Sequence, residues 1–400
     1  MAKPKIRFKG YEDDWEQRKL GEVFKEYSEK DHTELPTLTI VQGGGTVKRE
    51  ESDRNLMYDK SNLSNYKMVR KDDFIVHLRS FEGGLEKSLL DGIISPAYHT
   101  FHSEEADSRF YYPYFRSHEF IKHKLVPHVY GIRDGRSIDI DGMKTIEIPY
   151  TSMAEQRAIG DYLDSLDQLI TLHQQKCNET KKLKKYMLQK MFPEMGEKTP
   201  KIRFKGFTDD WEQRKLGEIA DLTSSKRVHA QDYVDSGIPF YRGKEISELR
   251  EHKPVSEVLY ITEEKYKEIA KLYGSPQVGD LLITAVGTIG NTWVVDNVPF
   301  YFKDGNLIWF KNIKCNPNYL DYVLSSDDGQ KKIDASAIGS NQKALTMVKL
   351  NELKFMFPND NEQVKIADYF RNLDHLITLH QQKCEELQKI KKFMLQNMFV

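Results

Sequence analysis

Two histidines and two cysteines stand at matched positions in this sequence. His173 and Cys177 lie in the nonapeptide LITLHQQKC, which returns letter for letter with His380 and Cys384. Imidazole nitrogen and thiolate sulfur are ligands that Zn²⁺ prefers, so these pairs, if brought together, would suit a tetrahedral zinc site. Side chains of this kind also pack in a helical seam, or set its register, without any ion. We favour packing, since the three cysteines, with Cys315, show no CxxC spacing.

Three short stretches resemble enzyme signatures but are incomplete. NPNY, at 316–319, lacks the second proline of the [ND]PP[YF] pattern of amino-methyltransferases, and we interpret it as a helix start. GIPFYRGKE, at 237–245, has five residues between its glycines where a P-loop has four, and Glu follows its Lys. The glycines at 43–45 favour a turn. The sequence therefore predicts no catalytic residues, no metal site and no bound cofactor in this chain.

Loop side chains of the kinds that contact DNA occur in both halves of the chain. Arg, Asn and Gln can read base edges, whereas Lys and Ser mostly bind phosphates. In the first half the candidates are Lys48, Arg49, Arg79, Ser80, Phe81, Lys87, Ser95, Tyr98, Arg133 and Arg136. In the second half they are Lys226, Arg227, Arg242, Lys244, Thr284, Thr288, Asn291, Asn341, Gln342 and Lys343. For each, a solvated loop residue is the alternative.

Composition limits the kind of protein that could position these residues. The chain has 400 residues, of which 39% are hydrophobic and 30% charged, and its mean hydropathy is -0.64. Two or three globular domains are expected. No apolar run is long enough for a membrane span or an export signal, so we expect a cytoplasmic protein. Because the net charge is -1, a nucleic-acid binder of this composition needs a local cationic face.

Two blocks of sequence occur twice. PKIRFKGYEDDWEQRKLGE, at 4–22, returns with two changes at 200–218, and the segment at 155–192 returns at 362–399. The segments between these blocks do not match. The predicted domains are a conserved block at 1–22, a variable domain at 23–150, a helical spacer at 151–199, a second block at 200–218, a second variable domain at 219–357 and a second spacer at 358–400.

The variable segments have the pattern of mixed α/β domains. Strands are predicted at DFIVHL, GIIS, TIEIPY, GDLLITAV, TWVV and LIWF, which are separated by Gly, Asn and Asp. Helices are predicted at 111–125 and at 318–335.

The long repeated segments carry a heptad seam. Its positions are Ile159, Leu163, Leu166, Ile170, His173, Cys177 and Thr180 in the first copy, and Ile366, Phe370, Leu373, Ile377, His380, Cys384 and Leu387 in the second. Each segment predicts a helix of roughly 57 Å. Such a helix with one apolar stripe needs a partner, and the other copy is the obvious one.

Charge predicts that the two helices are antiparallel. Each begins with acidic residues and ends with lysines, so antiparallel pairing places opposite charges side by side and also suits both helix dipoles. The lysine-rich ends, KKLKKYMLQK and IKKFMLQNMF, fit this seam or a partner surface better than a DNA contact. The predicted fold is α+β, with two mixed α/β domains joined by an antiparallel coiled coil and related by a pseudo-twofold axis.

The layout resembles the specificity subunit of Type I restriction-modification enzymes. The pattern EQ-x2-I-x3-[LF]-x2-LD-x2-I occurs at 155–170 and at 362–377, after Pro149 and Pro358, and W-x3-KLGE begins at Trp15 and at Trp211. The resemblance spans essentially the whole chain. Within the variable segments, VHLRSFEGGLEKS, SPAY and TAVGTIGNT resemble recognition-domain stretches of that family.

This resemblance implies a DNA-reading subunit without catalysis of its own. Each variable domain would be a target recognition domain that reads one half of an asymmetric, bipartite sequence in double-stranded DNA, and the helices would fix the gap. The partners implied are two adenine-methylating modification subunits and the restriction subunits, which would carry S-adenosylmethionine, ATP and Mg²⁺. No membrane partner is implied.

Two alternatives remain at the level of the sequence. A coiled-coil scaffold with two protein-binding heads would share the repeats but would select no DNA motif. A self-sufficient methyltransferase would bind S-adenosylmethionine without partners.

Overall fold

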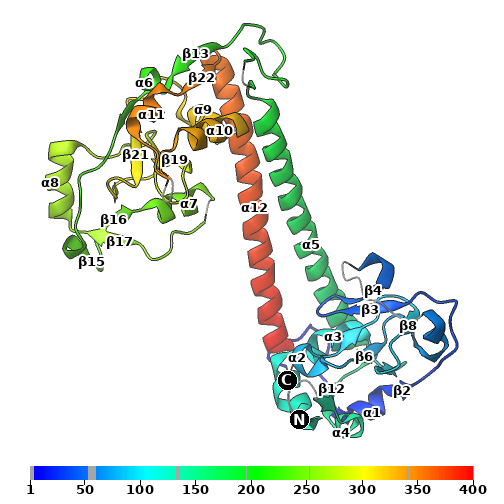
Figure 1. Ribbon diagram of the computed structural model, residues 1–400. Helices are drawn as coiled ribbons and strands as arrows, with labels where there is room; N and C mark the ends of the chain where they lie inside the picture. Colours follow the sequence, from blue (N-terminus) through cyan, green and yellow to red (C-terminus); the bar gives the residue numbers. More distant parts are fainter. Residues whose placement is uncertain are drawn as a thin grey trace. The chain divides into compact units, whose positions relative to one another are not determined.

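The chain forms two compact units in the computed structural model, which describes residues 4–52, 60–131, 136–194, 196–251, 253–339 and 343–399 (Figure 1). One unit comprises Met1–His173 with Lys383–Val400, and the other comprises Gln174–Gln382. The chain therefore passes between the units twice, each time within a long helix. Among the helices of the described residues, none combines the length and apolar character needed to cross a membrane.

The short repeated block closes each variable segment. Strand β1 (Glu16–Lys19) pairs with β12 (Glu147–Tyr150), and β13 (Glu212–Lys215) pairs with β22 (Lys354–Phe357), both antiparallel. A one-turn helix follows in each copy, α1 (Leu20–Val23) and α6 (Leu216–Ile219). The start and end of each variable segment therefore meet beside the long helix.

Both variable segments fold around the same four-stranded antiparallel sheet. In the first unit its order is β2 (Lys25–Tyr27), β9 (His99–His102), β6 (Phe74–Val76) and β7 (Glu86–Lys87). In the second it is β14 (Asp221–Thr223), β21 (Leu307–Lys311), β18 (Leu281–Thr284) and β19 (Thr292–Val294). The strands predicted at DFIVHL, GIIS, TIEIPY, GDLLITAV, TWVV and LIWF are all present.

Outside this sheet the two domains differ. The first adds the pairs β3 (Leu38–Val41) with β4 (Gly45–Lys48), β5 (Lys67–Val69) with β8 (Gly92–Ile94), and β10 (Val129–Tyr130) with β11 (Ser137–Ile138), as well as the helices η1 (Arg49–Glu51), η2 (Lys60–Asn65), α2 (Ser80–Gly83), η4 (Val126–His128) and α4 (Ile140–Lys144). The second adds a sheet in the order β15 (Tyr233–Val234), β17 (Leu259–Ile261), β16 (Ile238–Tyr241) and β20 (Tyr301–Phe302), as well as η6 (Ala230–Asp232), α7 (Gly243–Arg250), α8 (Glu263–Tyr273) and α11 (Met347–Glu352).

Each of the two helices predicted in the variable segments is in fact two shorter ones. Residues 111–125 contribute to α3 (Ser108–Phe115) and to the π-helix η3 (Glu119–Leu125). Residues 318–335 contribute to α9 (Pro317–Ser325) and α10 (Asp327–Ser336). Ser326 is the N-cap of α10, because its hydroxyl accepts a hydrogen bond from the N–H of Gly329. Ser117 lies between α3 and η3, and its hydroxyl accepts a hydrogen bond from the N–H of Phe120.

The two long helices are α5 (Met153–Lys190) and α12 (Asp360–Met398), and they pack antiparallel in each unit (Figure 1). In the first unit Lys391 Nζ lies 2.5 Å from Asp167 Oδ1, which brings the end of α12 to the start of α5. In the second unit Lys184 Nζ lies 2.5 Å from Asp374 Oδ1, which brings the end of α5 to the start of α12. The predicted charge pairing thus exists, and the antiparallel prediction is confirmed.

The predicted seam positions are the inward-facing ones. Those that are buried are Ile159, Leu163, Leu166, Cys177, Ile366, Phe370, Leu373, Ile377 and Leu387. Those that are half-buried are Ile170, His173, Thr180, His380 and Cys384. The thiol of Cys384 lies 3.5 Å from the carbonyl of Ile170, and the thiol of Cys177 lies 4.0 Å from the carbonyl of Ile377.

The end of each long helix completes the core at the start of the other. In the first unit Phe399, just beyond α12, lies 5.0 Å from Phe110 between ring centres, and Met398 is buried beside it. In the second unit Phe192, just beyond α5, lies 5.8 Å from Tyr319. Neither core is closed without residues from the other half of the chain.

Candidate nucleic-acid interface

A buried glutamate at the start of each long helix holds the repeated block in place. The carboxylate of Glu155 accepts hydrogen bonds from Arg7 at 2.5 and 2.8 Å and from the indole N–H of Trp15 at 3.1 Å. Glu362 binds Arg203 in the same bidentate way, at 2.7 and 2.8 Å. Burial by itself would raise the pKa of Glu155, but hydrogen bonds from Arg7 and Thr151 outweigh it and hold that pKa below its usual range.

The glutamine that follows each glutamate links the variable domain to the start of the same long helix. The side chain of Gln156 donates to the carbonyl of Thr151 at 2.8 Å and accepts from the backbone of Asp107 at 2.9 Å. Gln363 accepts from the backbone of Asn316 at 3.0 Å. Asp107 and Asn316 are the N-caps of α3 and α9, so NPNY starts a helix, as predicted. The repeated EQ pair therefore fixes how each domain leaves its helix.

In the first domain, most of the described candidate residues gather around the loop that joins β6 to β7. Arg79 is exposed at its tip and pairs with Glu82 at 2.7 Å. The guanidinium of Arg136 lies 4.5 Å from the centre of the Phe81 ring. The ring of Tyr98 lies 6.2 Å from that of His77, where the loop begins, and Tyr98 N–H donates to the carbonyl of Ser95.

Other candidates of the first domain have different positions. Lys48 is exposed beside Glu51, while Arg49 is half-buried in η1. Ser80 and Phe81 are buried, so they can affect a DNA contact only by shaping the loop. The side chain of Lys87 is turned away, only 12% exposed, and pairs with Asp72 at 3.1 Å. The prediction for Arg133 lies outside the described residues.

In the second domain, candidates from three separate segments meet at the equivalent loop, which joins β18 to β19. Val286 in this loop forms a β-bridge with Ala344, next to the exposed Lys343. Helix α7 (Gly243–Arg250) also packs on β19. The N-cap residue of this helix, Arg242, is held by the buried Glu245. Lys244, in the first turn, pairs with Glu257 at 2.9 Å.

The polar residues of this second loop mainly stabilise it. Thr284 is buried and donates to the carbonyl of Thr288, which is itself exposed. The amide of Asn291 donates to Ser247 at 2.8 Å and accepts from Arg250 at 3.2 Å. A DNA contact by Thr284 or Asn291 would therefore require the loop to rearrange.

The remaining candidates of the second domain lie after β14. The ammonium of Lys226 is 5.2 Å from the ring centre of Tyr273, and exposed Arg227 pairs with Asp304 at 3.1 Å. Asp304 lies in the turn before β21. The backbone N–H of Ala285 donates to the carbonyl of Asn306 in that turn, which brings the turn close to the β18–β19 loop. The predictions for Asn341 and Gln342 lie outside the described residues.

Many of the exposed cations around the two loops are paired with surface carboxylates. Such pairs contribute about 0–1 kcal/mol, because water screens them and both side chains lose freedom. A phosphate group could therefore replace the carboxylate at small cost. Cations held in such pairs would be available to a polyanion even though the net charge of the chain is -1.

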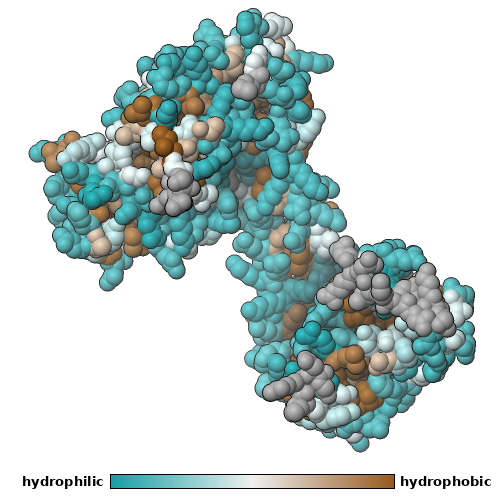
Figure 2. Space-filling view, viewed as in Figure 1, coloured by the Kyte–Doolittle hydropathy of each residue, from teal (hydrophilic) through white to brown (hydrophobic). Residues whose placement is uncertain are grey.

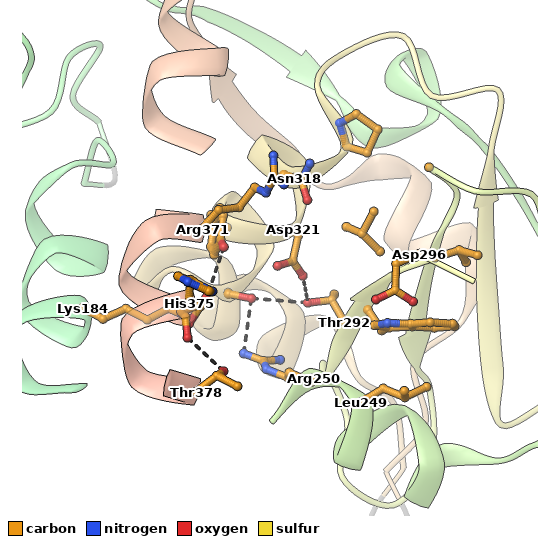
Figure 3. Close-up of a pocket in the computed structure, with 18 of the residues that line it drawn as sticks. Lys184, Leu249, Arg250, Thr292, Asp296, Asn318, Asp321, Arg371, His375 and Thr378 are labelled. Atoms are coloured by element: carbon orange, nitrogen blue, oxygen red, sulfur yellow. Dashed lines mark hydrogen bonds and ion pairs between the residues drawn. The ribbon is translucent and has the colours of Figure 1, made fainter. Parts of the chain in front are cut away.

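A cavity of about 620 Å³ lies within the second unit between α9 and the long helices (Figure 3). The hydroxyl of Tyr322 in α9 donates to the carboxylate of Asp374 in α12 at 2.8 Å. Burial raises the pKa of Asp321, although Thr292 donates a hydrogen bond to its carboxylate. The hydroxyl of Ser325 lies 3.3 Å from that of Thr292 and accepts from Arg250 at 3.2 Å. The two hydroxyls therefore form hydrogen bonds with a carboxylate and a guanidinium of the same unit, an arrangement that stabilises the packing of these elements.

No group of three or more His, Cys, Asp and Glu side chains suited to a metal ion occurs among the residues that the structure describes. In particular, the described seam histidines and cysteines form no such group.

Comparisons with known proteins agree with this layout. The family model described as the Type I restriction modification DNA specificity domain matches residues 12–182 and again residues 208–389. The chain is 24% identical over 269 residues to the Type I restriction enzyme MjaVIII specificity subunit of Methanocaldococcus jannaschii, a match that covers 64% of this chain but only 61% of that relative. It is 27% identical over 283 residues to a putative Type I restriction enzyme specificity subunit of Haemophilus influenzae, covering 69% of this chain and 67% of the relative.

Among solved structures, the fold is similar to that of the Type I restriction-modification system S subunit from M. genitalium. The TM-score is 0.62, the sequence identity is 15%, and the match covers 100% of this chain and 99% of that one.

Proposed function

This chain belongs to the family of Type I restriction-modification DNA specificity subunits, and from that premise we propose that it reads an asymmetric, bipartite DNA sequence without catalysing a reaction itself. The observation that carries the proposal is the matched pair of core sheets with unlike loops. Both sheets are anchored by the same EQ contacts, yet the β6–β7 and β18–β19 loops share no sequence pattern. Each domain would therefore read a different half-site.

The partners that we propose are two modification subunits and the restriction subunits of such a complex. S-adenosylmethionine, ATP and Mg²⁺ are then bound by those partners, and the complex acts on DNA in the cytoplasm.

A second apolar stripe on the long helices supports the docking of modification subunits. The first unit exposes Leu169 and Leu172 of α5 and Phe393 of α12, and the second exposes the equivalent Leu376 and Leu379 of α12 and Tyr186 of α5. All six are between 41% and 54% exposed. Hydrophobic side chains also reach the surface along these helices in Figure 2.

This stripe does not face the recognition domain. In the second unit Asp374 bonds Tyr322 of α9. A helix turns by about 100° per residue, so Leu376 points roughly 200° away from Asp374. The same apolar pattern occurs once in each unit, which suits one modification subunit per unit.

Selection on random DNA duplexes tests the main proposal. The chain, assembled with its modification subunits, should methylate or retain duplexes that share two unlike short motifs at a fixed gap. Enrichment of no bipartite motif would favour a scaffold with protein-binding heads. Binding of S-adenosylmethionine to the chain alone, measured by calorimetry, would favour a self-sufficient methyltransferase.

Charge placed in the stripes tests the docking surface. We expect Leu172→Asp to remove one modification subunit, Leu379→Asp to remove the other, and the double variant to remove both, as measured by native mass spectrometry. The control is Glu179→Gln, a change at an exposed position of α5, which should leave two modification subunits bound. Full occupancy in the double variant would exclude this surface.

A further inference from the structure

An exposed glutamine at the tip of a glycine hairpin stands beside the first recognition loop. We propose that Gln42 reads a base in the half-site of the first domain, and that the buried Glu86 positions it. The proposal rests on the function proposed above and adds a specificity residue that the pattern of loop cations did not indicate.

The hairpin tip consists almost entirely of backbone. Strands β3 and β4 are joined by Gln42, Gly43 and Gly44, and all three are exposed. Gly43 and Gly45 have positive φ angles of 83° and 72°, which side-chain-bearing residues rarely adopt. A two-stranded ribbon fits the major groove of B-DNA, and glycines at its tip let the backbone come close to the base edges.

The carboxylate of Glu86 fixes the backbone of this hairpin tip. This carboxylate is fully buried and accepts the backbone N–H of Gly43 at 2.7 Å and that of Gly45 at 3.2 Å. Tyr112 donates to the same carboxylate at 2.7 Å, and Arg116 completes it with an ion pair. Four donors, from the hairpin and from α3 with its C-cap residue Arg116, thus converge on one buried carboxylate, which holds the hairpin tip in a fixed position.

The amide of Gln42 is held over the recognition loop but is not used by it. A methyl group on Gly83 of that loop would lie 2.1 Å from Gln42 Nε2, so the amide packs directly on the loop backbone. Among the residues that the structure describes, none forms a hydrogen bond with this amide. Its donor and its acceptor both remain available to a ligand.

The surroundings indicate which ligand fits. Val41 and Leu89 are exposed at the same tip, and the guanidinium of Arg116 lies 3.0 Å from where a side chain on Gly43 would begin. A glutamine amide pairs bidentately with the N6 and N7 atoms of adenine, and neighbouring aliphatic groups suit a thymine methyl. The expected target is therefore an A·T pair in the first half-site.

The experiment measures sequence preference at each base of both half-sites. The complex of chain and modification subunits is used with the wild-type sequence, with Gln42→Ala, and with the matched control Gln17→Ala, an exposed glutamine in β1 of the same unit. We expect Gln42→Ala to reduce discrimination at one A·T position of one half-site by roughly five- to a hundred-fold. The other half-site, and both half-sites of Gln17→Ala, should not change.

A second variant tests the role of Glu86. Glu86→Gln keeps the volume but turns one accepting oxygen into a donor, so it should loosen the hairpin and weaken preference at the same position as Gln42→Ala. Unchanged preference at every position in the Gln42 variant would overturn the inference while leaving the proposed function intact. If the wild-type complex selected no bipartite motif, the proposed function itself would fall.

Discussion

Buried carboxylates set the local geometry of both recognition domains. Glu86, Glu155, Glu245 and Glu362 have essentially no exposed surface, although nothing in their sequence neighbourhoods separates them from the many exposed glutamates. Donors from distant segments satisfy Glu86, Glu155 and Glu362, whereas Arg242, three residues earlier, satisfies Glu245. The duplicated EQ pair marked Glu155 and Glu362 as part of a repeated pattern but did not predict that they are buried. The burial of all four became evident only once the donors were placed.

Loss of charge at Glu155 should destabilise the first unit. Glu155→Gln leaves the guanidinium of Arg7, which is only 13% exposed, without its partner, and breaking a buried pair in this way costs about 3 kcal/mol or more. Hydrogen exchange in urea, followed peptide by peptide, should show the loss in the first unit and little change in the second. Glu16→Gln, which breaks the exposed pair with Arg18, should change stability by less than about 0.5 kcal/mol.

The same carboxylate predicts an acid-labile first unit. The pKa of Glu155 is lower in the folded chain than its ordinary value of 4.5, so the unfolded chain binds the proton more readily. The stability that this group contributes is complete above about pH 4.5 and is lost as the pH falls through the lower, folded pKa. Urea unfolding midpoints between pH 6 and pH 3 should fall less steeply for Glu155→Gln than for the wild type. An equal slope in both would contradict this assignment.

At the level of elements, the heptad period and the repeated segments predicted the long helices well. The breaks within the shorter helices were not predicted. The heptad positions placed both long helices, and the acidic starts and basic ends placed them antiparallel, because these signals recur over many residues. The predicted helices at 111–125 and 318–335 are interrupted near Ser117 and at Ser326, where each serine hydroxyl accepts a hydrogen bond from a backbone N–H three residues ahead. The order of strands was not predictable, since it depends on pairings between distant segments.

The aromatic residue beyond each long helix should contribute strongly to the core that it enters. Phe399→Ala removes ring contacts with Trp15, Phe110 and Tyr114, and because Phe399 is half-buried we expect a loss of about 2–3 kcal/mol in the first unit. Hydrogen exchange of the first unit measures it. Phe393→Ala, six residues earlier and mostly exposed, is the control and should leave stability nearly unchanged. Equal effects of the two changes would argue against the packing described for the helix end.

At the scale of the whole molecule, the repeated segments make the two halves of the chain interdependent. The chain crosses from one unit to the other only inside α5 and α12, so these two helices are the covalent links between the domains that we propose to read DNA. If the helices set the gap between half-sites, the gap should change with their length and not with the sequence of the recognition loops.

Removing one heptad from both helices tests this dependence. Deletion of residues 174–180 and 376–382 keeps the seam in register, since the side-chain pattern repeats every seven residues, and shortens each helix by ~10 Å, the length of about three base pairs. Methylated sites mapped in a host carrying the variant should keep both half-site motifs and show a gap shorter by about three base pairs. Deleting three residues from each helix instead would move the seam positions off the shared face and should destabilise the pair. The same gap in the heptad variant and the wild type would show that the helices hold the partners together without setting the distance, because the half-sites would then be positioned by the modification subunits.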